Sequence, residues 1–260
     1  MTVHYEVADH IARVTIDRPD RLNAVDEATE HELQRVWSDI EARDDVWCAV
    51  LTGAGEKAFC VGADVKAAAE GDPGGVNYWL APRPGGFGGI ATRNSLTVPV
   101  IGRVNGHALG GGFEMMLGCD IVVASDNATF GLPEPRIGFI PLDGGMVQLA
   151  RHIPYRRAMG ILLTGGRFKA AEALEFGLIN EVVGQAELDE AVDRWVDQIL
   201  HCAPHSLRAV KAVVRQTAHL SVEDAMGRRL PELTDAFLAA DREEGMKAFV
   251  EKRRPNWQGR

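Results

Sequence analysis

The sequence lacks the short motifs by which several large classes of enzyme are recognised. It contains no GxxxxGK[ST] phosphate loop, no GxGxxG turn between a strand and a helix, no GxSxG nucleophile turn and no HExxH zinc motif. Kinases, nucleotide-dependent dehydrogenases, serine hydrolases and zinc proteases are therefore disfavoured. The eight histidines do not cluster, so we expect neither a metal site nor a redox cofactor.

Cysteine, positive charge and long apolar runs are also scarce. The four cysteines, at positions 48, 60, 119 and 202, show no CxxC or Cys/His metal spacing and are expected to be reduced thiols. Acidic residues outnumber basic ones by 37 to 28, which gives a net charge of -9 and disfavours nucleic acid or an anionic membrane as the main partner. No apolar run approaches the roughly 18 to 20 residues of a membrane span. Because the N-terminal segment does not resemble a signal peptide either, we expect a cytoplasmic protein.

The 260 residues, 46% of them hydrophobic, are enough to bury one large core. A helix is predicted after the N-cap Asp26, because Leu33, Trp37 and Ile40 recur at helical spacing. Short strands are predicted before and after it, over residues 3–8, 11–17, 47–52 and 58–61. This order of strand, helix and strand favours an α/β fold over a helical bundle.

The last third of the chain is predicted to be mainly helical. Apolar residues follow a helical period over 188–199 and again after Pro204, where the predicted apolar face consists of Leu207, Val210, Val213 and Val214. Further helices are expected to begin near a capping box at Ser221, at Pro231 and at Asp241. We expect this helical tail to pack on the core or on another subunit.

Residues 71–89 differ from the rest because glycine and proline dominate them. A loop of this length inside a compact domain is usually a functional lid or a disordered segment. Its aromatic and apolar residues suit a wall over an apolar ligand: Tyr78, Trp79, Leu80 and Phe87. A plain surface excursion is an equally good interpretation.

The most informative stretch lies between residues 100 and 145. It contains the triplet Gly110-Gly111-Gly112, followed by Glu114 and later by Glu134. A second turn, Gly62-Ala63, lies upstream. Two such turns can each direct a peptide N–H at one oxygen, which together make an oxyanion hole, and paired carboxylates are candidates for acid/base work. On the simpler interpretation, the glycines only allow a strand to turn sharply into a helix.

Several motifs occur together in the order and spacing of one family. They are FCVGAD (59–64), VNGHALGGGFE (104–114), CDIVVAS (119–125), FGLPE (130–134), LLTGGRF (162–168), AAEALEFGLINEVV (170–183) and REEGMKAFVEKRRPNW (242–257). With them the chain resembles the enoyl-CoA hydratase/isomerase, or crotonase, superfamily over nearly its whole length. The resemblance implies a spiral of ββα turns over residues 1–200, a helical region over 201–260 that forms a homotrimer or a dimer of trimers, and a coenzyme A thioester as substrate.

Matched residue by residue, the resemblance also implies a catalytic site. The backbone N–H groups of Ala63 and Gly111 fall on the oxyanion-hole positions. Glu134 falls on the main general acid/base, which delivers a proton to the substrate α-carbon, and Glu114 on the partner that holds and helps to deprotonate the water. Positions implied to contact substrate or coenzyme A are Ala24, Val61, Gly62, Asp64, Val65, Gly110, Pro133, Leu142 and Lys252. Coenzyme A is then part of the substrate, and no separate cofactor is expected.

Some positions depart from the family pattern. Dienoyl-CoA isomerases and carnitinyl-CoA dehydratases carry an aspartate where this chain has Leu142, and here the aspartate is Asp143. Asp143 either lines the acyl pocket or caps the helix from Gly144, and we expect the cap. His107 is expected to pack rather than to act as a base. The run from Lys252 to Arg254 either meets coenzyme A phosphates across a subunit contact or is a solvated charge run.

The function that fits these residues is a hydro-lyase that interconverts a trans-2-enoyl-CoA and a 3-hydroxyacyl-CoA. The alternative in the same class is a specialised hydratase, such as one for crotonobetainyl-CoA, or an isomerase. Dienoyl isomerisation is disfavoured because Leu142 replaces the extra aspartate. A noncatalytic acyl-CoA binding protein would not need two glutamates, and a thioester hydrolase is a third possibility.

Overall fold

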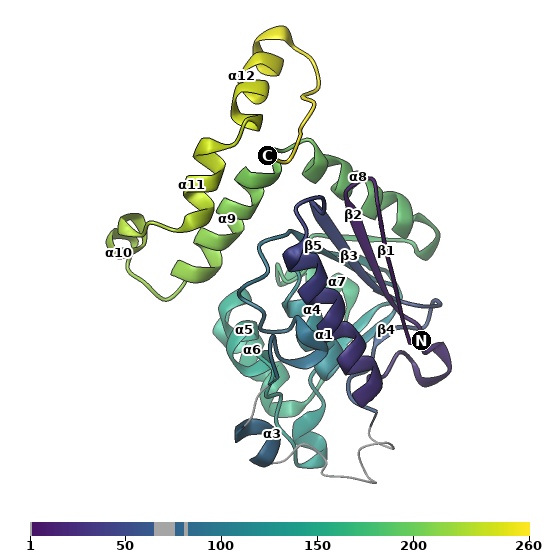
Figure 1. Ribbon diagram of the computed structural model, residues 1–260. Coiled ribbons are helices and arrows are strands. Elements are labelled where there is room, and N and C mark those ends of the chain that lie inside the picture. Colours follow the sequence, from purple (N-terminus) through teal and green to yellow (C-terminus); the bar gives the residue numbers. More distant parts are fainter. Residues whose placement is uncertain (1, 65–75, 81–82) are drawn as a thin grey trace.

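The computed structural model describes residues 2–64, 76–80 and 83–260, and its strands form two sheets (Figure 1). The larger sheet has the order β1-β2-β3-β5-β7-β10. Its strands are β1 (Val3–Ala8), β2 (Ile11–Ile16), β3 (Cys48–Gly53), β5 (Val100–Val104), β7 (Ile121–Ser125) and β10 (Glu181–Val183). β1 and β2, both predicted as strands, form an antiparallel hairpin, and all the other neighbours run parallel.

The smaller sheet has the order β4-β6-β8-β9. Its strands are β4 (Ala58–Cys60), β6 (His107–Leu109), β8 (Thr129–Gly131) and β9 (Arg167–Lys169). The pairs β3/β4, β5/β6 and β7/β8 each send one strand to either sheet, so the chain winds around as it advances. The α/β spiral implied by the resemblance is therefore confirmed.

Helices cover both faces of the larger sheet because β3 is apolar on both sides. Ala49 and Leu51 point into the main core with helix α1 (Glu27–Ala42), whose Leu33, Trp37 and Ile40 are fully buried. On the opposite face, Cys48 and Val50 pack with helix α8 (Leu188–Leu200). A strand buried on both faces reads as a continuous apolar run, which is what residues 46–51 show.

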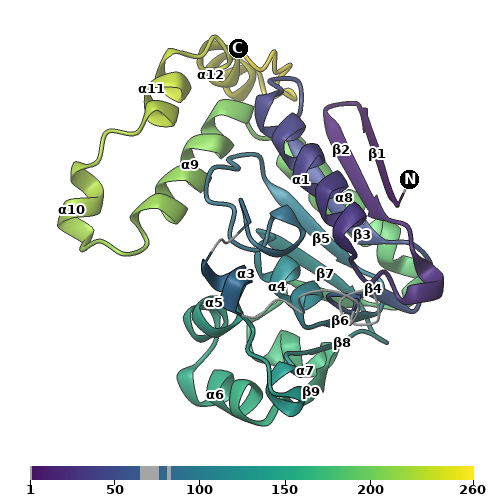
Figure 2. The same cartoon turned by 60° about the horizontal axis from the view of Figure 1, so that its bottom comes forward.

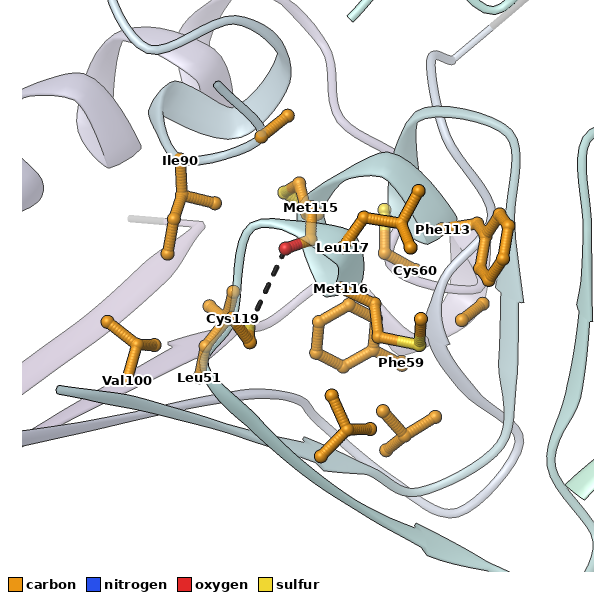
Figure 3. Packing of buried hydrophobic residues seen from close by; sticks show 14 of the residues in the cluster. Leu51, Phe59, Cys60, Ile90, Val100, Phe113, Met115, Met116, Leu117 and Cys119 are labelled. Atoms are coloured by element: carbon orange, nitrogen blue, oxygen red, sulfur yellow. Dashed lines mark hydrogen bonds between the residues drawn. The ribbon is translucent and has the colours of Figure 1, made fainter. Parts of the chain in front are cut away.

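Helix α4 (Gly111–Leu117) runs through the centre of the core, and every one of its residues is buried. Figure 3 shows Met115, Met116 and Leu117 of this helix packed among Phe59, Cys60, Leu51 and Val100, with the Cys119 thiol donating to Met115 O at 3.6 Å. A helix that is buried all round has little freedom to shift. Glu114 therefore stands on a rigid support.

The helix starts predicted from local chemistry are confirmed. Asp26 caps α1 by accepting the Thr29 N–H at 2.9 Å, and Ser221 caps α10 by accepting the Asp224 N–H at 3.1 Å. Pro231 is the first residue of α11. The remaining helices are α3 (Val76–Leu80), α5 (Gly145–His152), α6 (Tyr155–Thr164), α7 (Ala170–Glu175), α9 (Pro204–Thr217), α10 (Val222–Gly227), α11 (Pro231–Leu238) and α12 (Asp241–Glu251).

The last helices, α9 to α12, form an arm that extends away from the two sheets in both views (Figures 1 and 2). The apolar face predicted for α9 is wrong in part, because Val210 and Val214 are exposed. The face turned to the core carries Ala209, Lys211 and Ala212 instead. The Lys211 ammonium donates to Val98 O and pairs with Asp120, each at 2.6 Å. None of the helices among the described residues is long and apolar enough to cross a membrane.

Candidate active site

The glycine turn at the start of α4 fixes the position of Glu114. Gly110 has φ 55°, a left-handed conformation that favours glycine. Gly112 packs so closely on β4 that a Cβ placed on it would lie 2.1 Å from Cys60 O. The Glu114 side chain, only 3% exposed, accepts the Gly145 N–H at 2.9 Å through Oε1.

Glu134 follows strand β8 of the smaller sheet, and its side chain lies beside Gly110. It begins the short 3₁₀ helix Glu134–Ile137, directly after β8. A Cβ placed on Gly110 would lie 3.1 Å from Glu134 Oε1. Glu134 Oε2 is buried, and among the described residues no hydrogen-bond partner reaches it. A buried carboxylate oxygen without a protein partner is suited to bind a substrate or water.

Burial changes the acidity of both carboxyls, and neighbouring negative charges add to the effect at Glu114. Burial, followed by the nearby charge of Asp143, raises the pKa of Glu114 to about 8, and the charge of Glu134 acts in the same direction. Burial also raises the pKa of Glu134. Neighbouring carboxyls titrate as a coupled unit, so the pair retains a proton at neutral pH. One acid and one base then stand side by side.

Two backbone segments meet beside these carboxyls. A Cβ placed on Gly62, where φ is 93°, would lie 3.0 Å from Gly111 N. The Val25 N–H donates to Gly62 O, and the Asp64 N–H donates to Val25 O. The Ala63 N–H lies between them and is left out of this pairing. The Gly111 N–H, in the first turn of α4, has no acceptor within its own helix.

The predicted contact positions are partly gathered around these segments. Ala24 and Asp64 are tied together by Arg18, which donates to Ala24 O and to Asp64 Oδ2, the latter at 3.1 Å. The Val61 carbonyl lies 3.8 Å from a Cβ placed on Gly110. Pro133 and Leu142, both half-buried, adjoin Glu134 and Asp143 in sequence.

The remaining predicted contact positions are Val65 and Lys252. Val65 falls outside the described residues. Lys252 ends α12 in the C-terminal arm, at the opposite end of the molecule from α3 and α5 in Figure 1. Its predicted contact with coenzyme A stays a prediction that requires a neighbouring subunit.

The comparisons with known proteins agree with this geometry. The family model for enoyl-CoA hydratase/isomerase matches residues 6–260. The chain belongs to this enoyl-CoA hydratase/isomerase family.

The relatives within the family bear on the type of reaction. Carnitinyl-CoA dehydratases from Proteus mirabilis and Escherichia coli are 37% and 38% identical, each over 100% of this chain and 99% of the relative. The enoyl-CoA hydratase structures from Bacillus anthracis and Mycobacterium tuberculosis superpose with TM-scores of 0.92 and 0.90 at 32% and 33% identity. They cover 100% of this chain and 100% and 99% of theirs. The chain is an enzyme of the hydro-lyase type.

Asp143 has a different place in this family member from the one expected. The prediction that it caps α5 is wrong, because the cap position is Gly144 and no side chain caps the helix. Asp143 instead turns toward α3 and accepts the Tyr78 hydroxyl at 2.7 Å. Figure 2 shows α3 beside α4 and α5. The Asp143 carboxylate thus acts on the Glu114 carboxyl and does not cap the helix.

The glycine-rich segment contributes more to the site than its composition indicated. The Phe87 ring covers Gly111, since a Cβ placed there would lie 2.6 Å from it. Trp79 and Leu80 are 64% and 66% exposed, and residues 71–75 and 81–82 lie outside the described part. His107 bonds the Thr129 hydroxyl at 2.7 Å between β6 and β8, as a packing role requires.

Glu30 is a supporting residue that sequence reasoning missed. It is an acidic residue in the first turn of α1, a position that is usually solvated, yet Glu30 is only 2% exposed. Its carboxylate accepts the Gly88 N–H at 2.9 Å and lies 3.5 Å from the Arg83 guanidinium. Glu30 therefore fixes the segment that carries Phe87.

Glu114→Gln should change how stability depends on pH. In the unfolded chain the Glu114 carboxyl loses its proton near 4.5, whereas in the folded chain it keeps the proton to about 8. Between these values the folded state binds the extra proton, so the free energy of unfolding falls with rising pH by up to about 1.4 kcal/mol per pH unit. The glutamine variant should lose this slope in urea unfolding between pH 5 and 8. Identical slopes for both proteins would contradict the assigned proton.

Proposed function

We propose that the chain catalyses the reversible addition of water to a trans-2-enoyl-CoA to give a 3-hydroxyacyl-CoA. The observation that carries the proposal is that the buried Glu114 and the half-buried Glu134 lie close together beside the Gly110–Gly111 turn. Hydration needs one group that takes a proton from water and one that gives a proton to carbon. A coupled pair that keeps one proton at neutral pH supplies both.

The proposed reaction uses the two backbone N–H groups as well. The N–H groups of Ala63 and Gly111 hold the thioester oxygen, which becomes negative as the enolate forms, and each such donor is worth roughly 3 to 4 kcal/mol. In the reactive complex, the proton that the free enzyme holds on Glu114 has passed to Glu134. Water then attacks the β-carbon and loses a proton to Glu114, while Glu134 gives its proton to the α-carbon. The proton of the pair thus moves from Glu134 to Glu114, and the reverse reaction uses the same groups. Coenzyme A arrives as part of the substrate, and the proposed steps need no metal or redox cofactor.

A more specialised substrate is the second candidate. The curated relatives at 37% and 38% identity are carnitinyl-CoA dehydratases. Asp143 places an acidic side chain close to Glu114. A negative charge there favours an acyl group that carries positive charge over an apolar one. The substitution at Leu142 speaks against close equivalence with those relatives.

A panel of CoA thioesters separates these candidates. Hydration rates should be compared for crotonyl-CoA, longer trans-2-enoyl-CoA esters and crotonobetainyl-CoA, with free thiol release measured in the same samples. We expect loss of the conjugated enoyl-thioester absorbance without thiol release. A kcat/KM for crotonobetainyl-CoA far above the others would favour the specialised function. Thiol release as the main reaction would contradict both hydratase proposals.

We also propose that the C-terminal arm assembles the chain into a homotrimer or a dimer of trimers. Exposed apolar patches of more than a few hundred Å² mark interaction surfaces. Large apolar side chains exposed on α10 to α12 are Val222, Met226, Phe237, Leu238, Met246, Phe249 and Val250. A neighbouring subunit on this arm would also bring Lys252 within reach of a site other than its own.

A further inference from the structure

Asp143 takes part in a hydrogen-bond chain that ends on Glu114. The Tyr78 hydroxyl donates to Asp143 Oδ2 at 2.7 Å, and the Phe87 N–H also donates to the Asp143 carboxylate. On the other side, the backbone N–H groups of Asp143 and Gly145 donate to Glu114. The segment 143–145 therefore connects α3 and the Phe87 segment to the buried carboxyl of α4.

The two carboxyls in this chain differ in what stabilises their negative charge. Burial raises the pKa of Asp143, but its carboxylate also accepts a side-chain hydroxyl and a backbone N–H, and the Arg83 guanidinium favours its ionised form. Glu114 receives only backbone N–H groups and is almost completely buried. Hydrogen bonds and a nearby cation favour ionisation, whereas burial opposes it. Asp143 should therefore ionise first, which leaves its negative charge facing Glu114.

We infer that Asp143 is a positioning residue whose negative charge, held in place by Tyr78, keeps the shared proton on the Glu114–Glu134 pair. This inference rests on the proposed function, because the pair matters only if it transfers protons. It assigns Asp143 a role that an apolar residue at this position could not fill. Tyr78 acts one step further away, through Asp143.

Other charged groups near this chain do not replace Asp143. Arg83 lies with its guanidinium carbon 5.3 Å from the centre of the Tyr78 ring and 3.5 Å from the Glu30 carboxylate. Glu30 is occupied by Gly88 and Gln34. Glu134 also repels a charge on Glu114, but more weakly than Asp143 does. The strongest charge acting on Glu114 therefore comes from Asp143.

The first test is the pH dependence of kcat/KM for hydration of crotonyl-CoA. The rate should fall on the alkaline side as the pair loses its last proton. Asp143→Asn, which keeps the shape and an acceptor for Tyr78, should move this alkaline limb to lower pH by about one unit. Tyr78→Phe should move it in the same direction by less, and the double variant should match Asp143→Asn. Asp20→Asn, an exposed substitution, should leave the profile unchanged.

The second test does not depend on activity. Infrared spectroscopy detects the carbonyl stretch of a protonated carboxyl, and the band that disappears in Glu114→Gln belongs to Glu114. In Asp143→Asn this band should be lost at lower pH than in the wild type. If the Glu114 band and the alkaline limb of kcat/KM are both unchanged in Asp143→Asn, the inference is overturned. The proposed function stands in that case as long as the wild type hydrates crotonyl-CoA. A wild type without hydration but with a shifted band would overturn the function and retain the coupling.

Discussion

Glu134→Gln is expected to lower kcat for hydration of crotonyl-CoA by roughly 100- to 10,000-fold, the usual contribution of general acid/base catalysis. Glutamine has the same shape but neither delivers nor accepts the proton that passes to the α-carbon. Glu134 Oε2 has no hydrogen-bond partner among the described residues, so replacing this oxygen removes no hydrogen bond made by Oε2. Stopped-flow or steady-state absorbance of the enoyl thioester measures the loss, and isothermal titration with a saturated acyl-CoA should show nearly unchanged binding.

A matched control for this substitution is Glu175→Gln on α7. Its carboxylate is exposed and pairs with Arg157 at 3.4 Å, which is also on the surface. Surface pairs of this kind contribute little to stability, and kcat should stay within about twofold of the wild type. Near-normal hydration by Glu134→Gln would remove Glu134 from the proposed mechanism. A loss of CoA-ester binding equal to the loss of rate would make it a binding residue instead.

Gly112→Ala is expected to have the largest effect on the shape of the site. The new Cβ would lie 2.1 Å from Cys60 O and 2.6 Å from Cys60 C, and both are backbone atoms that have no alternative rotamer. The start of α4 must move away from β4, which separates Gly111 from the Gly62–Ala63 turn. Overpacking of this kind costs roughly 1–3 kcal/mol or more, and a displacement of about 1 Å can reduce the rate about 100-fold. Urea unfolding and kcat/KM measure the two effects.

Gly160→Ala provides the control for adding one methyl group. Gly160 lies on α6, and a Cβ placed there meets nothing within 4 Å. Alanine in a helix interior is favoured over glycine by roughly 0.5–1 kcal/mol, so this variant should be slightly more stable and fully active. If Gly112→Ala proved equally stable and active, the close contact between α4 and β4 would not be needed for the site.

Much of the fold could be predicted from local chemistry. The caps at Asp26 and Ser221 are short-range patterns, and the structure places helices directly after both. The hairpin and the doubly buried strand follow from apolar alternation and from an apolar run. The exposed face of α9 could not be predicted, because Val210 and Val214 look like core residues when the periodicity is considered alone. Which face a helix buries depends on the partner it meets.

The candidate site was predictable where a residue carries a motif and not where it depends on distant contacts. Glu114 and Glu134 stand in motifs that the family resemblance identifies. Asp143 was expected to cap α5, because it directly precedes the helix expected from Gly144. Its actual partner, Tyr78, lies 65 residues away in sequence. The role of Glu30 was missed for a similar reason. An acidic residue in the first turn of a helix is already explained by its favourable interaction with the helix dipole.

The most direct test of the central claim follows both ends of the double bond during one reaction. Crotonyl-CoA is incubated with the protein in heavy water enriched in a heavy oxygen isotope, and the product is analysed by mass spectrometry. The account predicts a 3-hydroxyacyl-CoA with solvent oxygen on the β-carbon and solvent deuterium on the α-carbon, formed far more slowly by Glu134→Gln. A product without solvent oxygen on the β-carbon, or free coenzyme A with crotonic acid, would contradict it.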